Sequence, residues 1–226
     1  EYAAALHSGE YPEAQRYLHE VRGITHSTAR RWELGYCADE FTALGGRITF
    51  PTRDFSRRIV SMGGRSVSPD LNPKVYYLPG WRKKRYLFGS HLLIRCPFVV
   101  IVEGQFDAMT LDQCGYPCVA VMGSDLSPLA AATLLIWTDA AVVYPDNTVP
   151  DEKAFTKALA WLPVLESVGV QAVFPNRPYP DATCADPDDL AQKNHGWLRD
   201  QIMECGKRLH SGRAGDDGLN IEEVSV

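Results

Sequence analysis

The chain has 226 residues, of which 45% are hydrophobic and 23% are charged, a balance that is typical of a globular protein and excludes a disordered chain. Its apolar runs are far shorter than the roughly 20 residues that span a bilayer, and we recognise no signal peptide, so we expect a soluble, intracellular protein. The net charge of -5 conceals an asymmetry: residues 47–95 hold 11 basic and two acidic residues, whereas residues 96–200 hold 14 acidic and five basic ones. This asymmetry indicates a polyanion bound by the first segment and cations bound by the second.

The cysteines and histidines argue against a fold that is stabilised by structural metal ions or by disulfide bonds. The six cysteines are dispersed and form no C-x-x-C pair, so the sequence indicates neither a zinc ribbon nor a disulfide framework. The six histidines are scattered without the spacing of metal ligands, and we expect solvated or locally hydrogen-bonded roles for them. The chain begins with Glu rather than Met, from which we expect a processed chain or an excised fragment.

The first hundred residues predict a small α+β lobe. Residues 10–22 have helical spacing, and a second helix is predicted from Thr25 or Ser27 to Leu34, ending at Gly35. The period then changes, because residues 47–52 and 58–62 alternate as strands do and a turn-like segment joins them, which predicts a hairpin. Residues 66–95 are rich in Pro, Gly, aromatic and basic residues and look irregular. We therefore assign residues 1–96 to an amino-terminal α+β basic lobe.

From Phe98 onward the sequence predicts four strands that are apolar throughout, each followed by a helix. The strands are residues 98–102, 118–122, 140–144 and 170–174, and the helices are residues 105–114, 127–136, 151–168 and 187–203. Such an alternation specifies a parallel sheet that is covered by helices on both faces, which is an α/β domain. We assign residues 97–207 to this domain and residues 208–226, which have linker composition, to a flexible tail.

Acidic residues follow two of these strands and precede the last helix. Glu103 and Asp146 stand just past strand ends, where ligands bind in parallel sheets, and Asp107 falls in the first turn of the next helix. Asp186 and Asp188 surround a proline immediately before the last helix. Clustered carboxylates repel one another unless a cation neutralises them, and such oxygen ligands suit magnesium or manganese.

A helix-capping role is the alternative explanation for these acids, because Asp is favoured at N-caps and in first turns. For Asp188 and Asp189 taken alone we favour that alternative. For Glu103 capping is a weak explanation, since a charge at the end of a buried apolar strand costs much free energy unless it is paired.

The acidic motifs together resemble a known domain. The segment Val100-Ile-Val-Glu103-Gly104-Gln-Phe-Asp107-Ala, then Asp146, then Asp186-Pro-Asp188 resemble the three acidic motifs of the TOPRIM domain in DnaG-type DNA primases of bacteria and phages. Upstream, Gly46-Arg-Ile-Thr-Phe-Pro-Thr-Arg53-Asp, Gly63-Gly-Arg65 and Pro73-Lys74-Val-Tyr-Tyr occur in the order of that family's RNA-polymerase subdomain. The similarity extends over roughly residues 15–200.

Two departures from the family pattern stand out. The second acidic motif usually resembles D-x-D-x-A-G-x-x-A, whereas here Thr148 occupies the place of the second acid. The family's amino-terminal zinc-binding module and carboxy-terminal helicase-binding module have no counterpart, so either they have been removed or they are separate proteins. We therefore expect no zinc site in this chain.

The resemblance implies a DNA primase, a nucleotidyltransferase that makes short RNA primers on single-stranded DNA during replication in the bacterial cytoplasm, or in the host cytoplasm for a phage protein. It implies Mg²⁺ or Mn²⁺ as cofactor and single-stranded DNA and ribonucleoside triphosphates as partners, with a zinc-binding module and a replicative helicase supplied in trans. The catalytic residues it implies are Glu103 and Asp146, and the metal ligands are Glu103, Asp107, Asp146, Asp186 and Asp188. The nucleic-acid-binding or nucleotide-binding residues it implies are Arg47, Arg53, Arg65, Lys74 and Lys83.

Two other functions fit parts of the sequence. A TOPRIM nuclease would use the same acids to activate water, although the primase-like amino-terminal lobe argues against it. A non-catalytic nucleic-acid-binding protein with a decayed metal site would explain Thr148. For the basic lobe, Tyr76, Tyr77 and Trp81 are candidates for stacking on bases, and the alternative is that these aromatic residues pack the core of the lobe.

Overall fold

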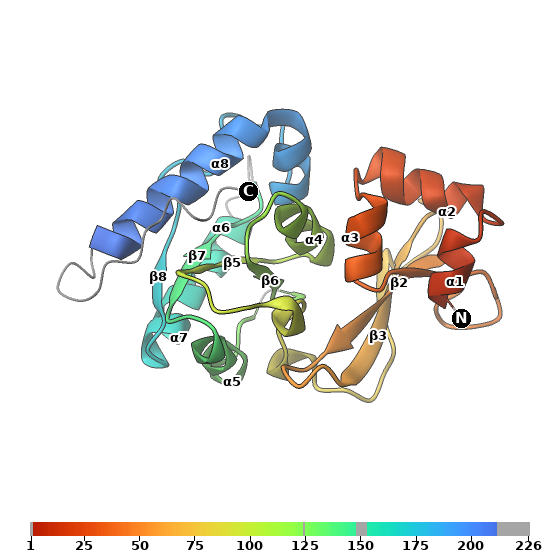
Figure 1. Ribbon diagram of the computed structural model, residues 1–226, viewed down its shortest axis with the longest axis horizontal. Helices are drawn as coiled ribbons and strands as arrows, with labels where there is room; N and C mark the ends of the chain where they lie inside the picture. The colour runs from red at the N-terminus through yellow and green to blue at the C-terminus, as the bar shows by residue number, and fades with distance from the viewer. Residues whose placement is uncertain (1, 124, 148–152, 212–226) are drawn as a thin grey trace. The chain divides into compact units, whose positions relative to one another are not determined.

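The computed structural model describes residues 2–123, 125–147 and 153–211, with the side chains of residues 153 and 154 left out (Figure 1). The chain divides into two compact units, Glu1–Arg82 and Lys83–Val226, which are described separately below. The boundary lies earlier than residue 96, so the segment 83–96 packs with the second unit rather than with the basic lobe. Within that segment Leu87 and Leu93 are buried in the core of the second unit. Among the described residues, no helix is long and apolar enough to cross a membrane.

Short helices open the first unit. They are α1 (Tyr2–His7), α2 (Pro12–Arg16), the π-helical turn η1 (Tyr17–Val21) and α3 (His26–Arg31). Thr25 caps α3 as predicted, because its hydroxyl accepts the backbone N–H of Thr28 at 3.2 Å. The predicted continuation of this helix to Leu34 is wrong, and α1 was not predicted. The chain leaves the helix where Glu33 adopts a φ of 55° and Leu34 becomes fully buried.

The strands of the first unit form one antiparallel sheet in the order β1-β2-β3-β4. The strands are β1 (Gly35–Cys37), β2 (Arg47–Arg53), β3 (Ile59–Ser66) and β4 (Val75–Tyr77). The predicted hairpin is β2 and β3, and Asp54 closes its turn by accepting the backbone N–H groups of Ser56 and Arg58. The region 66–95 is less irregular than expected, since it holds β4 and the 3-10 turns η2 (Lys83–Arg85) and η3 (Ser90–Leu92).

The second unit confirms the predicted α/β domain with a four-stranded parallel sheet. Its strands are β5 (Val99–Val102), β6 (Cys118–Ala120), β7 (Ala140–Val143) and β8 (Gln171–Val173), in the order β6-β5-β7-β8. Every residue of β5, β6 and β7 is buried, which is why these segments read as continuous apolar runs. Because β5 and β7 are neighbours and parallel, the residues that follow them lie at the same edge of the sheet.

Helices cover both faces of this sheet, as Figure 1 shows for α8 on one side and for α5 and α7 on the other. The helices are α4 (Gln105–Gln113), α5 (Pro128–Ala132), η4 (Thr133–Ile136), α6 (Lys153–Leu159), α7 (Trp161–Ser167) and α8 (Pro187–Ser211). The helix predicted over residues 151–168 is two helices that meet at Ala160. The last helix runs to Ser211 instead of residue 203, so the first residues of the predicted tail, 208–211, are helical, and the rest lies outside the described residues.

Candidate functional site

The edge of the parallel sheet carries the acidic residues that the sequence predicts. Glu103 follows β5 directly. Its backbone carbonyl accepts a hydrogen bond of 3.0 Å from the N–H of Met122, which lies just after the end of β6. Asp146 follows β7 after Tyr144 and Pro145. Met122 has a φ of 64°, an unfavourable backbone conformation for a residue with a side chain. Strained backbone of this kind is enriched at functional sites, and here it stands at the edge where the acids gather.

Asp107 lies in the first turn of α4, and its carboxylate is directed back toward Gly104. It is buried, and its Oδ1 accepts the backbone N–H of Asp188 at 3.1 Å. A β-carbon on Gly104 would lie 2.3 Å from Oδ2 of Asp107, so any other residue at position 104 would displace this carboxylate. The glutamate-glycine motif therefore has a steric reason here: the glycine makes room for the acid three residues later.

Burial and the charges of neighbouring acids raise the pKa values of both Asp107 and Asp146. Burial, followed by the charges of Asp186, Asp146 and Asp188, raises the pKa of Asp107 well above its ordinary value. Burial, followed by the charges of Glu103 and Asp186, raises the pKa of Asp146 to about 7, against a smaller lowering effect of Lys157. Oδ1 of Asp146 is buried and has no hydrogen-bond partner among the described residues. A cation at this edge would relieve both the repulsion and the missing interaction.

The two acids of the third motif differ in their surroundings. Asp186 caps α8, because its Oδ1 accepts the backbone N–H of Asp189 at 2.8 Å. Asp188 is deeply buried, and its Oδ1 accepts hydrogen bonds from Thr110 at 2.7 Å and from Gln192 at 2.9 Å. The capping alternative thus describes the local contacts of Asp186, although its charge still acts on Asp107 and Asp146.

The carboxylate oxygens near this edge of the sheet are the type of ligand that a hard divalent cation prefers. As the side chains stand, however, no three His, Cys, Asp or Glu residues within the described ranges are close enough together to hold a metal ion. Metal binding at this edge would therefore draw the carboxylates closer to one another. The metal-ligand assignment of Glu103, Asp107, Asp146, Asp186 and Asp188 stays a prediction.

Asn147 joins the second acidic motif to the loop that carries the third. Its backbone N–H donates to the carbonyl of Ala185 at 2.9 Å, and its side-chain Nδ2 donates to the carbonyls of Asp181 at 2.9 Å and Cys184 at 2.6 Å. Two tyrosines add to this connection, because Tyr179 donates to the carbonyl of Pro145 at 2.7 Å and Tyr144 donates to that of Pro178. Asn147 is thus placed to set the separation between Asp146 and Asp186.

We expect Asn147→Ala to lower the free energy of unfolding by about 1 to 2 kcal/mol, because two backbone carbonyls lose their donor. Urea denaturation of both proteins would measure this change. The matched control is Asn176→Ala in the loop that Asn147 contacts. Its exposed side chain donates to Glu204 and accepts from Arg208, and because these bonds are exposed, their loss should cost less than about 0.5 kcal/mol. Equal effects of the two substitutions would contradict the role assigned to Asn147.

Thr148, the predicted departure in the second motif, lies outside the described residues, as does Asp151. Lys83, in contrast, is well placed within the second unit. A β-carbon on Gly123 would lie 3.2 Å from Nζ of Lys83, so this ammonium group stands beside the loop that follows β6. The structure therefore brings one predicted basic residue to the same edge of the sheet as Glu103.

Arg47 is the most unusual of the predicted basic residues in the first unit. It is 3% exposed, and its Nε and Nη1 are buried without a hydrogen-bond partner among the described residues. Its guanidinium lies over the ring of Tyr76, 6.0 Å from the ring centroid. A β-carbon on Gly64 would lie 2.9 Å from the β-carbon of Arg47, so the glycine before Arg65 gives the Arg47 side chain its space. Two buried guanidinium nitrogens without an acceptor are costly, and an anionic ligand would supply one.

The other predicted basic residues of this unit have different contacts. Arg53 donates twice to the carboxylate of Glu33, at 2.6 Å and 2.8 Å, which favours a structural role for it. Arg65 donates its Nε–H to the hydroxyl of Tyr17 at 3.2 Å, and Lys74 is exposed just before β4. Their assignment to nucleic-acid or nucleotide binding stays a prediction.

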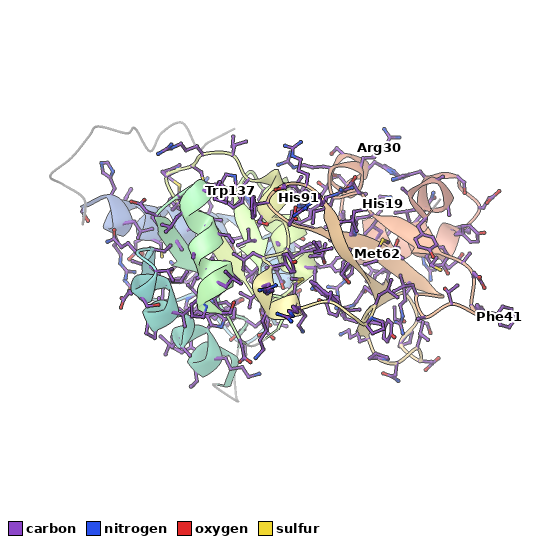
Figure 2. All side chains as sticks on the ribbon, turned by 90° about the horizontal axis from the view of Figure 1, so that it is seen from below. His19, Arg30, Phe41, Met62, His91 and Trp137 are labelled. Carbon is purple, nitrogen blue, oxygen red and sulfur yellow. The ribbon has the colours of Figure 1, made fainter. Side chains whose placement is uncertain are left out.

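The aromatic residues of the first unit divide into packed and exposed ones. Tyr77 packs against Phe50 and Trp81, with ring centroids 6.1 Å and 5.8 Å away, so the packing alternative describes this residue. Phe41 is fully exposed and points away from the rest of the unit in Figure 2. Phe41 was not predicted as a candidate, and its signal in the sequence is a large aromatic residue within the polar segment 39–42.

Comparison with known proteins supports the resemblance drawn from the motifs. Residues 98–173 match the model of the Toprim domain, which covers β5 to β8. The DNA primase of Thermotoga maritima is 34% identical over 156 residues, and the match covers 66% of this chain and 26% of that primase. The DNA primase of Aquifex aeolicus is 30% identical over 201 residues, covering 72% of this chain and 39% of the relative. The chain thus spans well under half the length of the curated primases that it matches.

A solved structure is similar to this chain over nearly its whole length. A structure of the DnaG primase catalytic domain bound to single-stranded DNA matches with a TM-score of 0.74 at 22% identity, covering 95% of this chain and 78% of that one. At this identity the likeness concerns the fold, and it extends over both compact units.

Proposed function

We propose, from the premise that this chain is a relative of the DnaG-type primases that shares their Toprim domain and catalytic-core fold, that it synthesises short RNA primers on single-stranded DNA during replication. The reaction would be nucleotidyl transfer, in which a ribose 3'-hydroxyl attacks the α-phosphate of a nucleoside triphosphate and pyrophosphate leaves. The observation that carries this proposal is the group of mutually repelling acids at the edge of the parallel sheet, where Oδ1 of Asp146 is buried without a partner among the described residues.

Some of the acids would act at the attacking 3'-hydroxyl, and the others would hold the cations that bind the triphosphate. Mg²⁺ or Mn²⁺, when bound, would neutralise the charge on the phosphates and favour ionisation of the attacking hydroxyl. Glu103 would accept the proton of that hydroxyl, or it would lie next to the metal ion that favours the ionisation of the hydroxyl. Asp107, Asp146 and Asp186, whose charges act on one another, would hold the cations. Asp188 would join this set while its hydrogen bonds to Thr110 and Gln192 keep Asp107 in position.

The basic residues would bind the template and the triphosphate. Arg47, with its buried guanidinium over Tyr76, would contact phosphate groups, and Arg65 and Lys74 would do so from β3 and from the residue before β4. Lys83, next to Gly123, would bind the triphosphate at the acidic edge. Such contacts bind any sequence, and the binding weakens as the salt concentration rises.

A zinc-binding module and a helicase supplied by other proteins would complete the machinery. Support for the first comes from the primase of Aquifex aeolicus, whose solved structure comprises zinc-binding and RNA polymerase domains; it matches this chain with a TM-score of 0.71 at 22% identity, covering 87% of this chain and 55% of that one. A primer-synthesis assay of this chain therefore needs an arm with an added zinc-binding module.

The test is a primer-synthesis assay with ribonucleotides, single-stranded DNA and either Mg²⁺ or Mn²⁺. We expect Glu103→Gln to reduce primer synthesis by about 100-fold or more, because the group that takes up the proton or holds the metal is lost. The matched control is Glu166→Gln, an exposed residue of α7, which should retain full activity. Thr148→Asp restores the family's second acid and should raise activity at low metal concentration.

The outcomes of this assay distinguish a primase from a nuclease and from a non-catalytic nucleic-acid-binding protein. Full activity of Glu103→Gln would refute the proposed site. Cleavage of DNA without primer synthesis would identify a nuclease instead. Tight DNA binding with no product under any metal, with or without an added zinc-binding module, would identify a non-catalytic binding protein.

A further inference from the structure

Two tyrosines of the second unit form reciprocal hydrogen bonds just after the end of β7. The hydroxyl of Tyr179 donates to the carbonyl of Pro145 at 2.7 Å. The hydroxyl of Tyr144 donates to the carbonyl of Pro178, so each tyrosine bonds to the proline that is next to the other tyrosine in the chain. The two rings also pack edge to face, with centroids 6.0 Å apart and an interplanar angle of 85°. This contact, which we call the tyrosine clasp, joins the end of β7 to the loop after β8.

The clasp is buried, and one of its tyrosines lies beside the acids. Tyr144 is fully buried and Tyr179 is 7% exposed, so water does not replace their hydroxyl groups as donors. Burial raises the pKa of both phenols, and both therefore stay neutral near neutral pH. The pKa of Tyr179 is raised first by burial and then by Tyr144 and by the charges of three acids, which are Asp146, Asp107 and Asp186. Tyr179 is thus within electrostatic reach of the acidic edge.

The bond from Tyr179 holds the peptide group that precedes Asp146. The carbonyl of Pro145 belongs to the peptide bond between Pro145 and Asp146, so the Tyr179 hydroxyl fixes the orientation of that planar group. On the other side of Asp146, the backbone N–H of Asn147 donates to the carbonyl of Ala185 at 2.9 Å. Asp146 therefore lies between two peptide groups that are both bonded to the segment before α8.

This backbone directs the carboxylate of Asp146. Its Oδ1 is buried without a hydrogen-bond partner among the described residues, so no bond to this oxygen fixes its direction. A rotation of the preceding peptide group would move the carboxylate relative to Glu103 and Asp186, whose charges act on it. Groups that orient metal ligands typically alter metal affinity by about 10- to 100-fold. The hydroxyl of Tyr179 is in the position of such a group.

The two bonds of the clasp differ in what depends on them. The carbonyl of Pro178 accepts the indole N–H of Trp197 at 3.2 Å as well as the hydroxyl of Tyr144. Removing the Tyr144 hydroxyl therefore leaves Pro178 with a donor. The carbonyl of Pro145, in contrast, has the Tyr179 hydroxyl as its donor. Removing that hydroxyl frees the peptide group at the acidic edge.

We propose that Tyr179 is a positioning residue that fixes the direction of the Asp146 carboxylate for a divalent cation, whereas Tyr144 stabilises the fold alone. This inference rests on the proposed function, because it concerns the cation site of that reaction. Tyr179 contacts neither the cation nor the substrate. It acts through the peptide group between Pro145 and Asp146.

The test compares Tyr179→Phe with Tyr144→Phe, a matched control that loses one hydroxyl from the same clasp. Binding of Mn²⁺ to each protein is measured at pH 8 by electron paramagnetic resonance of the free ion. Primer synthesis is measured as a function of the free Mn²⁺ concentration. Circular dichroism and thermal melting in the presence of a chelator report the fold and the stability of each variant.

We expect Tyr179→Phe to weaken the binding of Mn²⁺ by roughly tenfold, because the ligand Asp146 loses the group that orients it. Tyr144→Phe should bind Mn²⁺ as the wild type does, although its melting temperature falls. Excess Mn²⁺ should restore primer synthesis by Tyr179→Phe, since the acids themselves remain in place. A change in stability alone would not produce this dependence on the cation concentration.

Four results would overturn the inference: unchanged Mn²⁺ affinity of Tyr179→Phe, an equal loss of affinity in Tyr144→Phe, a loss of primer synthesis that excess Mn²⁺ does not restore, or a Tyr179→Phe protein that does not fold. A failure of the proposed function differs from these results. In that case the wild type would bind Mn²⁺ and lose affinity on Tyr179→Phe, yet it would make no primers. A wild type that binds no Mn²⁺ would refute both proposals together.

Discussion

Replacing Asp146 with asparagine is expected to make the protein more stable at pH 8 and to abolish primer synthesis. Stability and activity are expected to change in opposite directions for the same reason. Asp146 is a carboxyl group that burial and the charges of Glu103 and Asp186 penalise, and the proposed function needs that charge to hold a cation. Asparagine keeps the size of the side chain and removes the charge.

The stability effect depends on pH in a defined direction. The pKa of Asp146 is about 7 in the folded protein against an ordinary value of 3.8, so only at a pH well below 3.8 do both the folded and the unfolded states carry the proton. As the pH rises from 4 to 7, the unfolded state releases its proton first, and the free energy of unfolding of the wild type falls. The full difference corresponds to roughly 4 kcal/mol at most, and relaxation of neighbouring groups will reduce it. An asparagine side chain does not titrate, so the advantage of the Asp146→Asn variant grows over the same pH range.

Urea denaturation at pH 5 and pH 8 in the presence of a chelator measures this effect. Adding Mg²⁺ at pH 8 should stabilise the wild type and leave Asp146→Asn unchanged, because ligand binding to the folded state alone raises stability. Asp139→Asn is the matched control, since Asp139 is exposed and precedes the same strand that Asp146 follows. A variant that is no more stable at pH 8, or that still makes primers, would contradict the role of Asp146.

The second large effect is expected at Arg47, where Arg47→Met should weaken the binding of single-stranded DNA by about tenfold or more. Arg47 is a buried cation over Tyr76, and its Nε and Nη1 have no hydrogen-bond partner within the described ranges. The free protein therefore carries a desolvated charge that an anionic ligand would satisfy. Methionine fills a similar volume without the charge, so we expect the free energy of unfolding to stay the same or to rise by about 1 to 3 kcal/mol.

Fluorescence anisotropy at several salt concentrations tests the binding effect, and urea denaturation tests the stability effect. The salt slope should fall by about 0.7 to 1 if Arg47 contacts one phosphate. The control is Arg16→Met, an exposed arginine at the end of α2, which should change affinity little. If Arg47→Met lost stability and bound DNA as tightly as the wild type, Arg47 would be a structural residue of the first unit.

Much of the second unit could be predicted from local features of the sequence. Apolar runs such as residues 98–102 and 140–144 fit only strands that are buried on both faces, and the helices between them require parallel neighbours. The positions of Glu103 and Asp146 at strand ends followed from this pattern. Gly104 could also be noticed as part of a motif, but the collision of a β-carbon with Asp107 is visible only in three dimensions.

The surroundings of the individual charges could not be predicted in this way. Arg53 and Arg65 look alike in the sequence, yet Arg53 pairs with Glu33 whereas Arg65 meets Tyr17. Asp188 accepts a hydrogen bond from Thr110, which lies 78 residues earlier. The π-helical turn after Tyr17 was missed because residues 10–22 have ordinary helical spacing, and the register changes only where Arg22 bonds to Tyr17.

The sequence by itself determined the class of fold, the order of the strands along the chain and the residues at the strand ends, because the period of apolar residues is a property of neighbours in the chain. Tertiary structure alone decided which of these residues act together. Whether a carboxylate such as Asp146 or a guanidinium such as Arg47 lacks a partner depends on groups brought close from distant positions, and on the burial that strengthens or penalises their charges.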